Sequence, residues 1–441
     1  MKKGLLCSAV SAAIMATATL SSAAGLKINE QGAKAMGMAN AFTAQADDPT
    51  ALYYNPAGIA FLKGAQISLG TVIIAVPQTE FDGTTGLSGS NVVHERAKRD
   101  LFIAPNLYAT YTLDTLPVTL GLGVNSIYPL AKSWDNSSEF RNQIQNIAVK
   151  PINFQPTVAY LFKDWNLALA GGLDVTHAIV TLSKSVATPD PANPDTPVEL
   201  GLMGLDGTAT DLGYNFGLKW KPVKQLSLGA AYRSEVTLKV KGDANFLATS
   251  QAGAAAIGRS ADFTSFNSRI RATSTVSTTI TLPDSLALGI AWQPTEKLTL
   301  EFDAERTGWS SIKQLQFEFD SSQLNAFNDK PEPKDWHDAW AYKIGGQYAV
   351  NKNLDLRTGF AYDTNPIPDS TLGAMLPDAD RYNFTIGSGL HNDYFSIDTA
   401  YMWVHWLDRT VNNQDPVTLT GQNGTFRSDA HLFAANITVK F

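Results

Sequence analysis

Cysteine is almost missing from this chain of 441 residues, and its one cysteine, Cys7, lies close to the start. Disulfide bonds are therefore not available to hold the fold together. Long apolar runs are missing as well: no stretch of about 18 apolar residues follows the first 24 residues, so we expect no transmembrane helix. Charge of one sign is also lacking, because 34 basic residues stand against 41 acidic ones. This balance argues against a nucleic-acid partner.

The first 23 residues have the three parts of an export signal. Lys2 and Lys3 form a basic start, residues 4–20 are apolar and rich in Ala and Leu, and residues 21–24 are small. A membrane anchor is the alternative, but the apolar run is short and no stop-transfer charges follow it. By the small-residue rule, cleavage after Ala23 and cleavage after Ala24 both fit. We expect a cleaved signal and a mature chain without cysteine.

Apolar and polar residues alternate with a period of two along most of the remaining chain. In residues 165–184, Leu167, Leu169 and Leu173 share one parity, while Asp174 and Thr176 share the other. Such segments are typical of strands with one apolar and one polar face. About fourteen of them are expected, starting near residues 66, 102, 117, 153, 166, 209, 226, 274, 297, 338, 354, 382, 395 and 430.

The links between these strands alternate between short and long, which is typical of an outer-membrane barrel with tight inner turns and long outer loops. A soluble β-sandwich or propeller is the alternative, but it would not place aromatic residues so regularly at strand ends. Those residues are Trp165, Trp292, Trp309, Trp340, Tyr382 and Trp403. The last strand ends on Phe441, which resembles the terminal signal that barrel-assembly machinery reads. We therefore predict an all-β membrane protein, an antiparallel transmembrane β-barrel of about 14 strands over residues 66–441.

A barrel of this size is too wide for its own side chains to fill, so further material must occupy the lumen. Residues 24–65 are rich in Ala and Gly, lack strand alternation and read as short helices, with Asn55 as a cap and Pro56 in the first turn. The polar parity of the strands should face the lumen and form mainly structural ion pairs. The residues expected there are Arg233, Glu235, Glu301, Asp303, Glu305, Lys343, Arg357 and Asp398.

Several segments in order resemble the FadL/TodX family of outer-membrane transporters for long-chain fatty acids and other hydrophobic compounds. They include "AGLKINEQGAKAMGMANAF", "ADDPTALYYNPAG", "YRSEVTLKVKGDANF" and "LPDSLALGIAWQPTEKLTLEFDAERTGWSSIKQL". The resemblance places signal cleavage after Ala23. It also implies a small N-terminal helical hatch over residues 24–65, marked by Asn55, Pro56 and Ala57, and substrate release sideways through the barrel wall.

The resemblance also suggests where a fatty-acid carboxylate would bind. Lys184 has the lumen parity near the outer end of its strand, with Val180 and Leu182 as an apolar wall below it, and it matches a basic position of the family. Lys330 and Lys334 lie near a second basic position. A lysine is a point charge rather than a bidentate fork, so head-group selectivity should be looser than with arginine. The alternative is that Lys184 is a solvated lysine at the rim.

The resemblance implies an inward kink in the third strand as the lateral gate, and Pro129 falls near that place. Proline donates no ladder hydrogen bond, so the strand can bend inward there. The alternative is that Pro129 simply ends the strand and begins an outer loop. The expected partners are a long-chain fatty acid or another hydrophobic small molecule and the lipids of a Gram-negative outer membrane. The alternative substrates are aromatic or alkane hydrocarbons. We expect no metal or catalytic site, since the six histidines show no Ser/His or metal-ligand spacing. We also expect a monomer without a cofactor.

Overall fold

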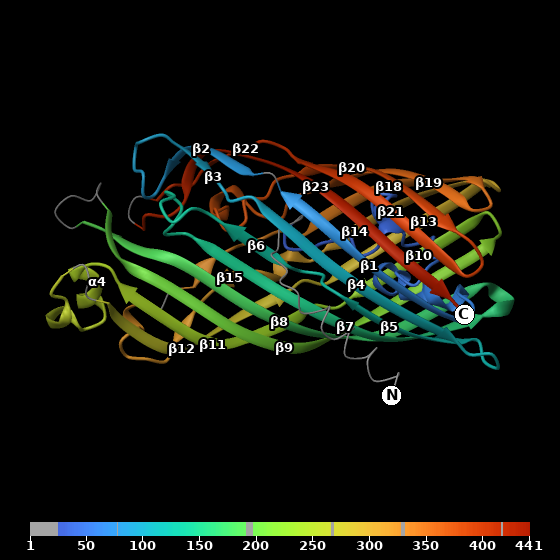
Figure 1. Ribbon diagram of the computed structural model, residues 1–441, viewed down its shortest axis with the longest axis horizontal. Coiled ribbons are helices and arrows are strands. Elements are labelled where there is room, and N and C mark those ends of the chain that lie inside the picture. The colour runs from blue at the N-terminus through green and yellow to red at the C-terminus, as the bar shows by residue number, and fades with distance from the viewer. Residues whose placement is uncertain (1–24, 77, 191–196, 266–268, 328–330, 416–417) are drawn as a thin grey trace, which may run out of the picture.

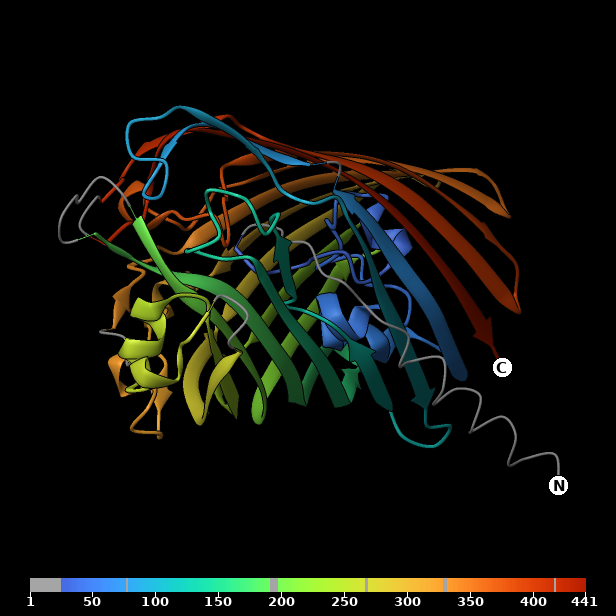
Figure 2. The ribbon, with the colours of Figure 1, turned by 60° about the vertical axis from the view of Figure 1, so that its left-hand side comes forward.

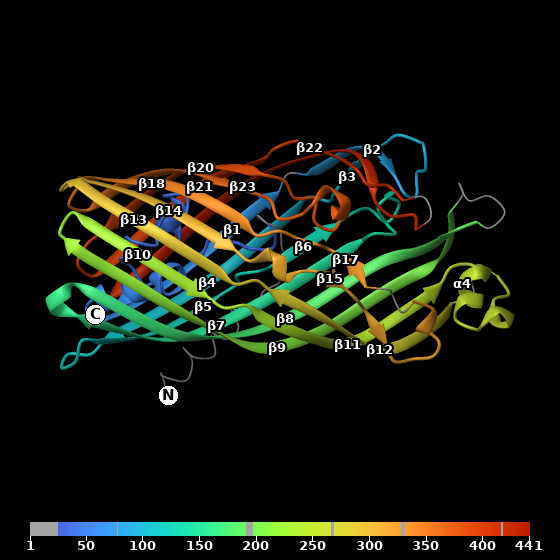
Figure 3. The same cartoon turned by 180° about the vertical axis from the view of Figure 1, so that it is seen from behind.

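Fourteen antiparallel strands close into one barrel in the computed structural model, which describes residues 25–441 except 77, 191–196, 266–268, 328–330 and 416–417 (Figure 1). The barrel closes where the first strand, β1 (Ala65–Val76), pairs with the last, β23 (Gln422–Lys440). On its other edge, β1 pairs with β4 (Asp100–Thr112). Short turns connect the strands at the end of the barrel near the C-terminus, and long loops gather at the opposite end (Figures 1 and 3).

The remaining wall strands follow in chain order, and at three places in the wall one position is formed by two consecutive strands. These pairs are β5 and β6 (Val118–Asn125, Leu130–Ser133), β10 and β11 (Leu226–Arg233, Val236–Ala248), and β12 and β13 (Ile270–Leu282, Ser285–Thr295). The single strands are β7 (Asn146–Phe162), β8 (Leu167–Pro189), β9 (Pro197–Val223), β14 (Leu298–Thr307), β18 (Ala339–Asn351), β19 (Leu354–Asp363), β20 (Arg381–His391) and β21 (Phe395–Trp406).

Short elements lie in the loops and inside the barrel. The extra strands are β2 (Thr79–Thr85), β3 (Val93–Arg96), β15 (Gln314–Leu315), β16 (Glu318–Phe319), β17 (Glu332–Pro333) and β22 (Arg409–Asn412). The helices are α2 (Ala33–Met36), α3 (Ala51–Tyr54) and α4 (Gln251–Ala256), with 3-10 turns η1 (Pro56–Phe61), η2 (Lys163–Trp165), η3 (Ser260–Asp262), η4 (Trp309–Ser311), η5 (Asn325–Phe327) and η6 (Asp369–Thr371). Within the described part of the chain, no helix has the length and apolar character needed to cross a bilayer.

The predicted count of fourteen strands is confirmed, but three strands begin earlier than expected. β7, β9 and β23 start at Asn146, Pro197 and Gln422 rather than near 153, 209 and 430. Their added parts extend toward the long loops, where the outer face is no longer apolar. On β9, for example, Thr208 and Thr210 are exposed. Apolar residues alternate with polar ones only in the lipid-facing part of such a strand. The extensions lack this alternation, so the sequence does not mark them as strand.

The outward parity of the wall is apolar and exposed, as an outer-membrane barrel requires. On β9, Tyr214, Phe216 and Trp220 are 42–54% exposed, whereas Asn215 and Lys219 between them are buried. Aromatic residues at strand ends also point outward, among them Trp165, Trp292, Trp340 and Trp403.

Trp309 is an exception, and its predicted place at the membrane surface is wrong. Its side chain is 1% exposed and packs edge-on against Tyr128 and Trp336. The reason is that β14 ends at Thr307 and the chain then turns inward through η4.

Glu235 is also placed differently from the prediction that it faces the lumen. Arg233 and its neighbour Ser234 are both buried, and Glu235 is exposed. The ladder is interrupted between β10 and β11, so the parity of the strand reverses there: Leu238 is buried, while Lys239 is exposed. The other charged residues predicted to face the lumen are buried inside: Arg233, Glu301, Asp303, Glu305, Lys343, Arg357 and Asp398.

Residues 25–64, here called the N-terminal segment, lie inside the barrel near its short-turn end (Figure 2). Charged groups on the wall bind its backbone. The Asp303 carboxylate accepts hydrogen bonds from the N–H groups of Phe42 and Thr43, both at 2.9 Å. The Glu301 carboxylate accepts those of Ala44 and Gln45. Because the segment makes almost no regular structure there, these carboxylates satisfy backbone donors that would otherwise be buried without partners.

Asn55 ties two parts of the N-terminal segment to the wall. Its side-chain oxygen accepts a hydrogen bond from the N–H of Ala57, which caps η1, and Pro56 is the first residue of that turn. Its amide nitrogen donates to the carbonyl of Thr43 at 2.7 Å and to the carbonyl of Leu218 on β9 at 2.9 Å. All three bonds are formed by a fully buried side chain.

Replacing Asn55 by Ala should therefore loosen the N-terminal segment. Each buried carbonyl left without a donor costs about 1–3 kcal/mol, while the barrel ladder is unchanged. We expect higher ion conductance of the protein in planar bilayers and faster proteolysis within residues 25–64. Asn91→Ala, at an exposed loop position, is the control. Unchanged conductance and proteolysis in Asn55→Ala would show that these bonds do not hold the segment.

Candidate functional site

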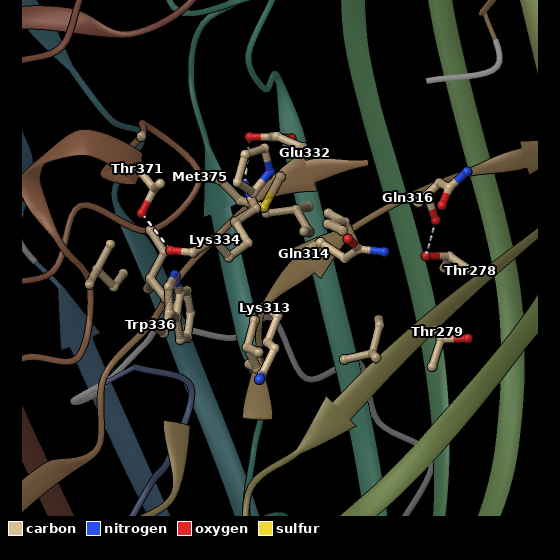
Figure 4. A pocket seen from close by; sticks show the side chains of 18 of the residues that line it. Thr278, Thr279, Lys313, Gln314, Gln316, Glu332, Lys334, Trp336, Thr371 and Met375 are labelled. Atoms are coloured by element: carbon tan, nitrogen blue, oxygen red, sulfur yellow. Dashed lines mark hydrogen bonds and ion pairs between the residues drawn. The ribbon is translucent and has the colours of Figure 1, made fainter. Parts of the chain in front are cut away.

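A cavity of about 930 Å³ lies between the N-terminal segment and the outer loops (Figure 4). Its size is within the range of roughly 300–1,000 Å³ typical of small-molecule sites. Its walls come from β7, β8, β11 and β12, from residues 311–318 and 332–336, and from residues 367–376. Leu26 of the N-terminal segment also lines it. The cavity is therefore bounded by parts of the chain that are far apart in sequence.

Five lysines line this cavity: Lys184, Lys239, Lys241, Lys313 and Lys334. Lys334 forms an ion pair with Glu332 at 2.6 Å. Lys184 is half-buried, and no acceptor for its ammonium group is present among the described residues. The Lys184 side chain lines the cavity, as its predicted lumen-facing parity requires. However, β8 does not end at Lys184 but continues to Pro189. The cavity is therefore lined by a lysine that forms no ion pair with any described residue.

A smaller apolar pocket of about 50 Å³ adjoins the cavity. Val180 and Leu182 line it together with Leu205 and Phe317. The two spaces share lining residues, including Ile147, Val149, Val240 and Ile280. The structure thus brings Lys184, Val180, Leu182 and Lys334 to connected spaces, whereas Lys330 lies outside the described residues.

Trp336 adds a neutral donor that the sequence analysis did not single out. It lines the cavity, and its buried indole Nε1–H has no acceptor among the described residues. Its ring packs against Trp309 with centroids 5.4 Å apart, and Trp309 packs against Tyr128. The one feature of the sequence that could have pointed to Trp336 is its place in a loop close to Lys330 and Lys334. Its position in the cavity depends on the inward course of the loop, which periodicity does not reveal.

The N-terminal segment is fixed at the base of the cavity. The N–H of Gly25 donates to the Asp378 carboxylate at 2.8 Å, and the Trp406 indole donates to the same group at 3.1 Å. Burial raises the pKa of the Asp378 carboxyl, and Arg381 opposes this shift. Gly25 has a positive φ of 64°, and a Cβ there would lie 2.5 Å from the ring of Trp309. Only glycine therefore fits at this contact.

The barrel wall is interrupted beside the cavity. β4 pairs with β5 only over Leu107–Thr112, and no ladder joins its residues 102–106 to a described strand on that edge. β5 ends at Asn125, and β6 resumes at Leu130 on the same neighbour, β7. Pro129 lies in the gap and is buried. Leu130 lines the cavity, so the cavity reaches the interruption.

Between the two strands, the chain bends inward onto the N-terminal segment. The carbonyl of Ile127 accepts the N–H of Ile28 at 2.8 Å, and the carbonyl of Ser126 accepts the Gln31 side chain at 2.6 Å. The strand therefore bends and resumes rather than ending in an outer loop. Prolines also occur in the bordering strands, at 105 in β4 and at 151 and 156 in β7. Each lacks a ladder donor, which weakens pairing in this part of the wall.

No group of three or more His, Cys, Asp or Glu side chains suited to a metal ion occurs among residues 25–441 as far as they are described. The cavity instead offers apolar walls, cations and one indole donor. This set of groups suits an amphiphilic or apolar organic molecule.

Comparisons with known proteins agree with this geometry. A sequence profile of the family described as "Outer membrane protein transport protein (OMPP1/FadL/TodX)" matches residues 14–441. The long-chain fatty acid transport protein of Escherichia coli O6:H1 is 24% identical over 416 residues, covering 90% of each chain. Outer membrane protein P1 of Haemophilus influenzae is 24% identical over 478 residues, covering 97% of this chain and 98% of its own.

Solved structures show the same fold. The Pseudomonas aeruginosa FadL homologue superposes with a TM-score of 0.82 at 21% identity, over 95% of this chain and 100% of that one. The toluene transporter TbuX of Ralstonia pickettii superposes with a TM-score of 0.67 at 19% identity, over 93% of this chain and 98% of that one. Because the family profile spans almost the whole chain, this protein belongs to the OMPP1/FadL/TodX family and is a transport protein of the Gram-negative outer membrane.

Proposed function

We propose that this protein takes up long-chain fatty acids, binds them in the cavity beside Lys184 and releases them sideways through the interrupted wall. The observation that carries the proposal is a half-buried lysine that lines the cavity, forms no ion pair with a described residue, and lies on the same strand as Val180 and Leu182 of the adjoining apolar pocket. A carboxylate buried without a partner costs several kcal/mol, and a nearby cation offsets that cost. Relatives with this fold are named for fatty acids and for toluene, so the head-group site decides between these substrate classes.

The proposed carboxylate site consists of Lys184 with two further groups. The indole N–H of Trp336 has no acceptor among the described residues and could donate to a carboxylate oxygen. Lys334 contributes positive charge, although Glu332 offsets part of it. The alkyl chain would extend toward Val180 and Leu182, where the small pocket is lined almost wholly by apolar atoms.

The N-terminal segment obstructs the lumen below the cavity, so we propose that the substrate leaves through the wall. The N-terminal segment is proposed to act as a fixed hatch, held by Asn55, Pro56 and Ala57 and by the wall carboxylates. A long-chain fatty acid gains about 0.8 kcal/mol per CH₂ on leaving water, so a sideways path into the bilayer is favourable. The cavity reaches Leu130 at the interruption, and outward-facing Leu101 and Ile103 border it on the lipid side.

The second candidate is a channel for aromatic or alkane hydrocarbons. The apolar lining of the small pocket favours it, because a hydrocarbon needs no polar partner. In that case Lys184 would be a solvated residue at the rim of the cavity, without a role in binding.

Replacing Lys184 by Met tests the fatty-acid site. We expect the affinity for oleate to fall about tenfold, which corresponds to about 1.4 kcal/mol, because the buried carboxylate loses its cation. Affinity for an alkane of similar length should not change. Both are measured on the purified protein, with Lys224→Met in an exposed turn as the control. Equal effects on both ligands, or no effect on either, would favour the hydrocarbon channel.

The proposed gate is tested by closing the interrupted wall. Ala104 on β4 and Ala131 on β6 belong to one buried apolar cluster beside the interruption. Cysteines at both positions, joined by a cleavable bifunctional thiol reagent, should stop fatty-acid uptake by cells, and reduction should restore it.

The matched control for the gate is a cysteine pair at Leu107 and Val124, which already face each other across paired strands. Joining them should leave uptake unchanged. Full uptake with the Ala104–Ala131 bridge formed would rule out release at this place.

A further inference from the structure

Three cations, Lys98, Arg99 and Lys150, border the interrupted wall and are here called the wall cations. Lys98 and Arg99 directly precede β4 and are exposed. The N–H of Lys98 donates to the carbonyl of Ser133, the last residue of β6, at 2.8 Å. Lys150 lies on β7, which pairs with the other edge of β6. The wall cations therefore stand on both sides of the strand that resumes after the interruption.

Lys150 faces away from the cavity. Its neighbour Val149 is 2% exposed and lines the cavity. Successive side chains of a strand point to opposite faces, and the next residues with the parity of Lys150 are Ile152 and, after Prolines and Asn153 are passed, Phe154. Phe154 is 45% exposed, as expected of a side chain that contacts lipid. Lys150 is therefore on the lipid-facing surface, with the cavity behind its own strand.

The wall cations lie at the outer edge of the apolar belt. On β4, Leu101 is 57% exposed and Ile103 is 42% exposed, and Arg99 comes two residues beyond Leu101. On β7, Lys150 comes two residues beyond Ile152. With a rise of about 3.3 Å per residue and a strand tilt near 40°, two residues correspond to about 5 Å along the barrel axis. At this level the hydrocarbon of the bilayer meets the head groups.

The wall cations are not neutralised by acidic side chains in the described part of the chain, where none of them forms an ion pair. The nearby Arg96 is held by Glu80 at 3.1 Å. Asp135 lies near Lys98, but its carboxylate accepts hydrogen bonds from the N–H and the hydroxyl of Ser137 at 3.2 and 3.1 Å.

Two arginines elsewhere on the outward face are neutralised instead. Arg306 on β14 pairs with Asp284 at 3.2 Å and with Asp338 at 2.7 Å. Arg427 on β23 pairs with Asp82 at 2.6 Å and with Asp408 at 3.0 Å. At the interrupted wall, by contrast, the positive charge is available to an anion that does not belong to the protein.

A carboxylate that leaves through the wall needs a partner on the lipid side. Inside, Lys184 lines the cavity, and the cavity reaches the interruption at Leu130. Beyond the wall, the head group enters the edge of the bilayer, where an ionised carboxylate without a partner costs several kcal/mol. Cations at the opening offset this cost, and salt screens their attraction because they are largely exposed.

We propose that the wall cations form a receiving site, which binds the carboxylate of a single-chain anionic amphiphile as it passes from the cavity into the bilayer. The alkyl chain lies against Leu101, Ile103 and Phe154 in the belt below. The inference rests on the lateral release proposed above and adds the groups that the head group meets outside the wall. Because the site is on the path and not in the cavity, it changes the rate of release but not the affinity of the cavity.

The receiving site is tested by removing one cation on each side of β6, in Arg99→Gln with Lys150→Gln. Arg269→Gln with Arg271→Gln is the matched control, because it removes the same charge at exposed positions near the start of β12, away from the interruption. Arg99→Lys with Lys150→Arg keeps the charge and should behave as the wild type.

Release is measured on the protein in nanodiscs of neutral lipid. Brominated oleate bound in the cavity quenches Trp336, and the fluorescence recovers as the ligand leaves into an excess of empty vesicles. The Trp336 signal is taken as the difference from Trp336→Phe. We expect release about threefold slower from the Gln pair at 99 and 150 than from the wild type at low salt, and similar rates at high salt. Equilibrium affinity should stay within twofold, and a brominated fatty alcohol should leave all variants at the same rate.

Three results would overturn the receiving site. Equal release of brominated oleate from the Gln pair and the wild type at low salt would show that the wall cations do not act on the head group. Equal slowing of acid and alcohol would show that the substitutions change the wall itself. Slowing of the same size by the control pair would show an effect of general surface charge.

Two further outcomes concern the occupant and the underlying function. If the wall cations serve the phosphates of an outer-leaflet glycolipid instead, the Gln pair will differ from the wild type only in nanodiscs that contain a phosphorylated glycolipid, and the receiving site is wrong. If the wild type does not bind brominated oleate, or releases it at an unchanged rate with the Ala104–Ala131 bridge formed, the proposed function fails, and the receiving site fails with it. The wild-type measurements therefore separate the two failures.

Discussion

The wall's hydrogen bonds to the backbone of the N-terminal segment are the interaction on which the rest of the structure depends. A barrel of fourteen strands leaves a lumen that its own side chains do not fill. The segment inside has few regular elements, so its buried N–H and C=O groups need partners from the wall. Glu301 and Asp303 accept from four consecutive N–H groups, and Lys219 donates to the carbonyls of Gln45 and Ala46. Part of the buried charge in this barrel therefore holds the segment, while other buried pairs, such as Arg357 with Asp398 and Arg381 with Asp363, join wall strands to one another.

A fixed segment determines which paths remain for a ligand. The cavity lies above it, and Leu26 forms part of the cavity wall. The interruption of the wall at Leu130 borders the same cavity. There, prolines remove ladder donors and the chain bends inward. We propose that a fatty acid leaves the cavity for the bilayer through the interrupted wall without crossing an aqueous pore.

Much of the fold was predictable from the sequence, because the lipid imposes a strict alternation on every membrane-facing residue. The strand count, the inward charges and the parity of Lys184 follow from that alternation. The errors have local causes. Glu235 faces outward because two residues at the β10–β11 junction leave the ladder, and Trp309 is buried because the chain enters the lumen after Thr307. Neither event changes the alternation pattern. Part of the cavity lining was also beyond prediction, since Trp336, Lys313 and Leu26 meet only in three dimensions.

We propose that the substrate leaves through the wall while the N-terminal segment stays in place. The hydroxyl of Ser227 on β10 donates to the carbonyl of Ala44 at 2.7 Å, so these two positions are in contact. The most direct measurement is fatty-acid uptake by cells carrying Ala44→Cys and Ser227→Cys, before and after disulfide formation. Uptake should be the same when the segment is locked to the wall. Uptake that is lost on oxidation and recovered on reduction would contradict it and show that the segment must move out of the barrel.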